Sequence, residues 1–235
     1  MNIYKFVFIS IFLIKFSGFS QDINQFDEAG KRHGIWKKNF EGTKVTRYEG
    51  EFFHGKEIGI FKYYKNIGNH AVLTATKAFN KDNSIATVKF LASTGKVISE
   101  GQMDDKKYIG TWKYYHRYSD NLLTLEHYNN NGELHGERIV YYTNGAMAEK
   151  QNYLNGNLQG ESVWYTKEQT ILKSYSYNNG ELHGLSQFYN PLGELITEGH
   201  YKNGKKAGVW KYYENGNLVE EKDMSAKPKR IKKTP

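Results

Sequence analysis

Aromatic and charged residues alternate along much of this chain, with the two-residue period of a β-strand whose faces differ. Trp210 and Tyr212 stand two residues apart and share one face, and Lys211 points to the other face. Asn215-Gly216 follows, and this pair readily adopts the positive φ angles of a two-residue hairpin turn. Residues 208–221 are therefore predicted to form a hairpin with aromatic rings on one face and charged side chains on the other.

This hairpin pattern recurs at nearly constant spacing, with steps of 24 to 26 residues between units. A single hairpin is marginally stable in water, so each unit is expected to pack against its neighbours. We predict an all-β fold in which residues 34–224 form one elongated antiparallel meander of about eight tandem hairpin repeats, or sixteen strands. The units begin at Gly34, Gly59, Ser84, Gly110, Gly136, Gly160, Gly184 and Gly208.

Charged side chains are predicted to cover the face opposite the rings. Lysines stand between ring positions, and glutamates recur in the second strand of the units. A sheet with no second layer depends on its rings for burial, so the charged residues are assigned to the other face. The glutamates concerned are Glu49, Glu100, Glu126, Glu149, Glu198 and Glu221.

The two ends of the chain do not follow the repeat. Residues 1–20 contain Lys5, an apolar run and small residues before Gln21, which is the order of a secretory signal peptide. We therefore expect export to the periplasm, the outer envelope or the secreted space. Residues 21–33 are expected to form a polar lead, and residues 225–235 a basic disordered tail.

The net charge of +8 belongs to these ends. Without the seven basic residues at the two ends, the remaining chain has 26 basic residues against 25 acidic ones. Non-specific nucleic-acid binding depends on basic charge, so a nearly neutral body argues against a nucleic-acid partner. The basic tail is a candidate for binding anionic lipid, through Lys227, Lys229, Arg230, Lys232 and Lys233.

Residue patterns typical of catalytic or metal chemistry are missing from the sequence. The absence of cysteine excludes disulfides, thiolate nucleophiles and Cys-ligated metals, and neither a Gly-x-Ser-x-Gly motif nor a phosphate-binding loop is present. His33, His135 and His183 each precede a repeat glycine, but His135 and His183 stand two units, or roughly 20 Å, apart. They cannot share one ion, so no catalytic residue, metal or cofactor is predicted.

The pattern Gly-x-Trp-x-Tyr-Tyr-x-x-Gly-x-Leu-x-x-Glu-x-x-Tyr-x-Asn-Gly-x-x-x-Gly resembles the variant MORN repeat (membrane occupation and recognition nexus). Tandem arrays of this kind are similar to bacterial proteins grouped as the YwqK-type antitoxin family. The resemblance covers about residues 26–224 and is strongest over residues 184–221. It implies a twisted antiparallel sheet without enzymatic chemistry, used as an interaction surface or to neutralise a toxin.

Three functions are consistent with these features. We favour a non-enzymatic scaffold of the envelope or secreted space that binds another protein along its sheet. An antitoxin or immunity protein acting on a partner toxin is the first alternative, and peripheral membrane binding is the second. Most rings are expected to form the core, and part of the ring stripe is a candidate for contact with a partner. The candidate residues are Trp36, Trp112, Tyr114, Trp164, Trp210 and Tyr212.

Overall fold

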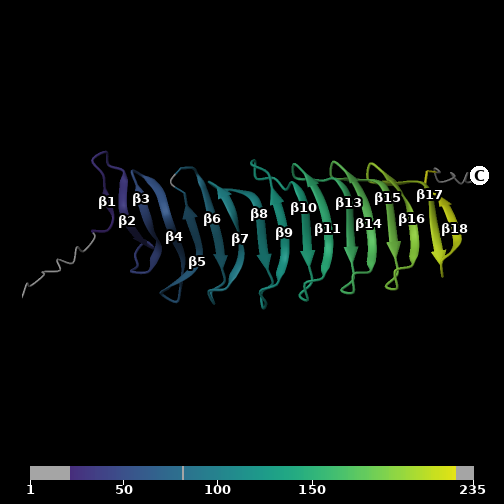
Figure 1. Cartoon of the computed structure of the whole chain (residues 1–235), viewed down its shortest axis with the longest axis horizontal. Coiled ribbons are helices and arrows are strands. Elements are labelled where there is room, and N and C mark those ends of the chain that lie inside the picture. The colour runs from purple at the N-terminus through teal and green to yellow at the C-terminus, as the bar shows by residue number, and fades with distance from the viewer. Residues whose placement is uncertain (1–21, 81, 226–235) are drawn as a thin grey trace, which may run out of the picture.

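The computed structural model describes residues 22–80 and 82–225, which form a single open sheet of 18 strands. The strands lie side by side in chain order along the long axis of the molecule (Figure 1). The first nine are β1 (Gln25–Phe26), β2 (Arg32–Asn39), β3 (Thr46–Phe53), β4 (Lys56–Ile67), β5 (His70–Phe79), β6 (Ile85–Leu91), β7 (Val97–Asp104), β8 (Lys107–Tyr115) and β9 (Leu122–Tyr128). The others are β10 (Gly136–Tyr141), β11 (Met147–Leu154), β12 (Asn157–Leu158), β13 (Gly160–Tyr165), β14 (Ile171–Asn178), β15 (Glu181–Tyr189), β16 (Leu195–Lys202), β17 (Lys205–Glu214) and β18 (Asn217–Asp223).

Each hairpin pairs antiparallel with the next, which confirms the predicted meander. The two strands beyond the predicted sixteen are short. β1 lies within the segment predicted as a polar lead, and β12 is separated from β13 by Gln159 alone. No helix within the described ranges has the length and apolar character needed to cross a membrane.

Four Asn-Gly pairs form the predicted turn, whereas at Asn131-Gly132 and Asn144-Gly145 only the glycine has a positive φ angle. Asn155, Asn179, Asn203 and Asn215 have φ angles of 48–50°, and the glycine after each has a φ angle of 75–84°. Both central residues of a type I′ turn need positive φ, and asparagine and glycine adopt it at the lowest cost. These turns therefore set the register of the hairpins that they close.

The glycine that begins a unit accompanies a bulge in four units, at Gly59, Gly110, Gly184 and Gly208. In the second unit, Gly59 has a φ angle of 64°. Glu49 pairs with Lys62 and Glu51 with Ile58, so Gly50 alone stands opposite residues 59–61. The bulge shifts the two-residue alternation of side chains between the two faces of the strand. As a result, the residue four positions before the central aromatic ring lies on the same face as that ring. Tyr108, for example, stacks on Trp112 with ring centroids 3.8 Å apart.

The core of the ring face contains three glycine–ring pairs, in each of which the ring follows the glycine by eleven residues. Trp112 of β8 lies flat on the backbone of Gly101 in β7, where an added Cβ would stand 2.5 Å from the indole. Trp112 has no exposed surface, because Tyr108 covers its other side. Phe61 packs on Gly50, and Trp210 on Gly199, in the same way. Glycine in the middle of these strands thus makes room for a ring that supplies burial to a single-layer sheet.

The ring face changes character in the middle of the array. Glu126 of β9 and Arg138 of β10 occupy the positions of Gly101 and Trp112, with Arg138 Nε 3.1 Å from a Glu126 carboxylate oxygen. Arg138 also reaches Glu149, 3.6 Å away. Glu126 and Glu149 therefore lie on the ring face, and their assignment to the opposite face is wrong. The reason is that an arginine replaces the ring here and needs partners for its charge.

Candidate functional site

The six aromatic residues predicted as partner contacts all lie on the ring face, but they differ in exposure. Trp36, Trp112 and Trp210 are buried, whereas Tyr114, Trp164 and Tyr212 are half-buried. The indole N–H groups of Trp112 and Trp210 donate to the backbone carbonyls of Gln102 and His200, at 2.9 and 3.2 Å. These buried tryptophans have packing partners and satisfied polar atoms. Contact between the six residues and a partner stays a prediction.

Arg138 is the centre of a polar cluster that interrupts the rings. Besides its two glutamates, it donates from Nη1 to the side-chain oxygen of Gln151 at 3.2 Å. The hydroxyl of Tyr128 donates to Glu126 at 2.7 Å. Burial and this hydrogen bond raise the pKa of Tyr128 above its ordinary value. Arg138 is thus shared between two carboxylates, and the neutral side chains of Gln151 and Tyr128 add hydrogen bonds to the cluster.

The opposite face carries the alternating lysines and glutamates that the sequence predicts. Glu100 stands opposite Lys89 on one side and Lys113 on the other, and its carboxylate lies 3.3 Å from Lys89. The hydroxyl of Tyr115 donates to Glu100 at 2.6 Å. This bond is the largest cause of the lowered pKa of Glu100, and burial with the same bond raises the pKa of Tyr115 to about 12.

This charged face has a shallow hollow of about 300 Å³ near its N-terminal end. Three isoleucines on its lining, Ile23, Ile35 and Ile60, are 53%, 39% and 63% exposed. Charged residues of both signs line the rest of the hollow: Lys37, Glu49, Glu51 and Lys62. Exposed isoleucines surrounded by charged groups resemble the apolar centre and polar rim of a protein-binding surface.

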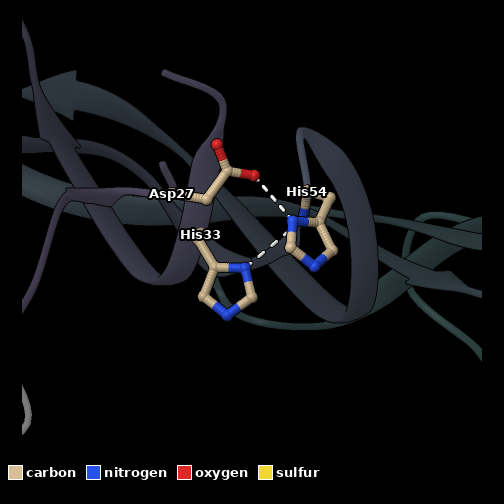
Figure 2. Close-up of side chains that lie close together, drawn as sticks. All are labelled: Asp27, His33 and His54. Atoms are coloured by element: carbon tan, nitrogen blue, oxygen red, sulfur yellow. Dashed lines mark hydrogen bonds and ion pairs between the residues drawn. The ribbon is translucent and has the colours of Figure 1, made fainter. Parts of the chain in front are cut away.

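A cluster of possible metal ligands lies at the N-terminal end of the sheet. It consists of Asp27 from the β1–β2 turn, His33 from β2 and His54 from the β3–β4 turn, and one ligand atom of each lies within 4.8 Å of the others. Figure 2 shows the three side chains pointing toward one another. Asp27 Oδ2 lies 2.6 Å from His54 Nδ1. This bond and a backbone bond from Lys31 lower the pKa of Asp27.

Sequence reasoning did not find this cluster. His54 is 21 residues beyond His33, and its place in a two-residue turn, where other units have asparagine, was the available signal. The other two histidines of the repeat contact asparagine: His135 Nδ1 lies 3.2 Å from Asn155 Oδ1, and the equivalent distance from His183 to Asn203 is 3.3 Å. Each histidine thus contacts the two-residue turn of the unit that begins directly after it.

Two predictions fall outside the described residues. The signal peptide (residues 1–20) and the tail residues Lys227, Lys229, Arg230, Lys232 and Lys233 are not described. Residue 225, the first of the predicted tail, is described: the backbone N–H of Gly208 donates to its hydroxyl at 3.0 Å. For the residues after Ser225, the basic disordered tail stays a prediction.

Comparison with known families agrees with the repeat. Residues 134–155, 182–203 and 208–224 match the family model of the MORN repeat variant. The chain contains MORN repeats. The matched segments fall in the C-terminal half of the chain, where the unit length is most regular. The narrower assignment to YwqK-type antitoxins stays a prediction.

No curated protein matches this chain. Among solved structures, one match is the crystal structure of the S. aureus TarM G117R mutant in complex with Fondaparinux, alpha-GlcNAc-glycerol and UDP. It is 14% identical, with a TM-score of 0.21, and the match covers 63% of this chain and 21% of the other. The MORN chain thus spans about a fifth of that protein's length, and so low a TM-score supports no argument about fold or function.

Proposed function

We propose that this MORN-repeat protein is a non-enzymatic scaffold of the cell envelope or secreted space that binds another protein along its sheet. MORN repeats are compatible with a scaffold for protein or membrane interactions. Within residues 22–80 and 82–225 the strands form one layer, so both broad faces are open to a partner. We expect residues 1–20 to direct export, and therefore expect a partner outside the cytoplasm.

The observation that carries the proposal is the hollow on the charged face. Ile35 and Ile60 lie on regular strands and expose apolar surface to solvent in this hollow. Lys and Glu side chains surround them in equal numbers. An anionic lipid surface would repel the glutamates, whereas a protein with mixed charges complements both signs. The hollow therefore favours a protein partner over a membrane.

The proposal is tested by affinity capture from an envelope extract of the source organism, with the tagged full-length chain as bait. The double variant Ile35→Thr/Ile60→Thr keeps β-branched side chains, which suit a strand, and removes the apolar surface. The matched control is Leu192→Thr, which removes an 82% exposed apolar residue from a turn far along the array. We expect one dominant protein, reduced about tenfold by the double variant, which corresponds to ~1.4 kcal/mol of binding free energy.

Two outcomes would contradict the proposal. If the wild-type bait retains no protein beyond bare resin, the scaffold function is refuted. If the double variant and the control retain the partner equally, the hollow is not the binding surface. Mass spectrometry of the protein isolated from the envelope fraction tests export separately, because cleavage of the signal peptide leaves Gln21 at the N-terminus.

A further inference from the structure

Unit five provides an internal comparison for the Asp27–His33–His54 cluster. The segment Phe26–Gly34 aligns with Tyr128–Gly136, so Asn129, His135 and Asn155 occupy the positions of Asp27, His33 and His54. Asn129 Nδ2 donates to Asn155 Oδ1 at 3.2 Å, and His135 Nδ1 lies 3.2 Å from the same oxygen. The repeat thus brings three side chains together at this corner.

The first unit differs from unit five at two of these three positions. A carboxylate replaces the amide of Asn129, and an imidazole replaces the amide of Asn155. Both changes replace a neutral amide with a stronger ligand for divalent transition metals. The turn does not require His54, since asparagine fills the same position with the same positive φ in other units. Two changes at one corner therefore convert a hydrogen-bonded set into a set of metal ligands.

The carboxylate of Asp27 is already oriented for this role. Its Oδ1 accepts hydrogen bonds from the backbone N–H groups of Ala29 and Lys31, at 3.0 and 2.8 Å. These bonds fix the side chain and leave Oδ2 directed at His54. Backbone donors that hold a ligating carboxylate in place are a regular part of protein metal sites.

We propose that Asp27, His33 and His54 bind one Zn²⁺ ion or a similar divalent transition metal ion, with water as a fourth ligand. Two histidines and one carboxylate are a ligand set that zinc accepts. Ligands ~2.0–2.1 Å from a tetrahedral ion stand about 3.3 Å apart, so the 2.6 Å separation of Asp27 Oδ2 and His54 Nδ1 must widen by about 0.7 Å. The side chain of His54 is 56% exposed and lies on a turn, which gives it room to move.

The ion would act as a clip on the end of the sheet. It would join the β1–β2 turn to the β3–β4 turn, across the edge where the two-residue strand β1 covers β2. β1 is also held by Phe26, whose ring packs edge-on to Trp36 at 5.1 Å, and by the Trp36 indole N–H, which donates to the Gln25 carbonyl at 3.0 Å. On binding, the Nδ1 proton shared between His54 and Asp27 leaves to solvent.

Isothermal titration of the full-length chain with ZnCl2, after removal of metal by chelation and dialysis, tests the site. We expect one ion per chain, bound at micromolar concentration or tighter. Asp27→Asn and His54→Asn each copy unit five and keep the local hydrogen bonds, so both variants should fold. Each should weaken Zn²⁺ binding at least tenfold, the range measured when residues that support metal ligands are removed. His135→Asn, the control at the equivalent corner, should leave the titration unchanged.

The converse experiment adds a site. The double variant Asn129→Asp/Asn155→His installs the three ligands in unit five, and the stoichiometry should rise from one ion to two. Thermal unfolding with Zn²⁺ gives a second readout, because an ion that binds the folded state raises the melting temperature. Absence of Zn²⁺ binding at 100 µM, equal binding by wild type and His54→Asn, or equal loss in His135→Asn would each overturn the proposal.

Discussion

The contact between Trp112 and Gly101 predicts that Gly101→Ala destabilises the middle of the sheet. The new methyl group would stand 2.5–2.6 Å from Cδ2, Cε2 and Cγ of the indole, well inside ordinary contact distance. The ring cannot retreat, because Tyr108 is stacked on its other side, only 12° from parallel. Moving it by the roughly 1 Å required also stretches the 2.9 Å bond to the Gln102 carbonyl.

The magnitude follows from these contacts. Overpacking a close-packed site costs about 1–3 kcal/mol, and a strained hydrogen bond adds up to ~1 kcal/mol. Alanine recovers ~0.5 kcal/mol relative to glycine in a strand, through the smaller loss of backbone entropy. These contributions give a net loss of unfolding free energy of about 0.5–3.5 kcal/mol. In a chain of this length, each kcal/mol lowers the melting temperature by about 2–4 °C.

Urea unfolding followed by circular dichroism measures the loss, and hydrogen exchange localises it to β7 and β8. A double-mutant cycle isolates the contact: in a Trp112→Ala background, Gly101→Ala should cost less than ~0.5 kcal/mol, because the ring that it strikes is gone. Both variants are compared with wild type under the same conditions. The reasoning fails if Gly101→Ala costs less than ~0.5 kcal/mol in wild type, or costs the same in both backgrounds.

Three other regions give further predictions. Arg138→Ala should lower the unfolding free energy by about 2 kcal/mol. This is less than the ~3–5 kcal/mol that breaking a fully buried ion pair costs, because Arg138 is partly exposed. A loss below ~0.5 kcal/mol in urea unfolding would contradict this prediction and would mean that water replaces the arginine beside Glu126. Burial and the Glu100 bond raise the pKa of Tyr115 to about 12, so the stabilisation from its neutral phenol is complete below pH 10 and lost as the pH rises toward 12. Glu100→Gln should shift this pKa toward 10 in an ultraviolet titration with Tyr115→Phe as reference, and an unchanged titration would contradict the assigned bond. A chain ending at Met224 should sediment less with anionic liposomes than the full chain, whereas equal binding would exclude the tail.

Much of the architecture was predictable from local chemistry. Asn-Gly pairs specify two-residue turns, two-residue alternation specifies strands with unlike faces, and a nearly constant spacing specifies a meander. Alternation also placed Glu49 and Glu100 with the lysines. The assignment was wrong for Glu126 and Glu149. All the second-strand glutamates were assigned to the face opposite the rings, without regard to Arg138, which pairs with these two on the ring face.

The sequence by itself determined the repeating hairpins, because turn and strand preferences act between neighbouring residues. Only the tertiary structure decided which residues of different hairpins touch. The flat packing of Trp112 on Gly101 depends on a bulge that rotates one strand face, and the meeting of Asp27 with His54 depends on the register of three strands. A one-residue change in the register of β7 and β8 would turn Trp112 away from Gly101, and one between β1, β2 and β3 would move the turn of Asp27 along the edge from that of His54. A repeat pattern alone does not specify register to that precision.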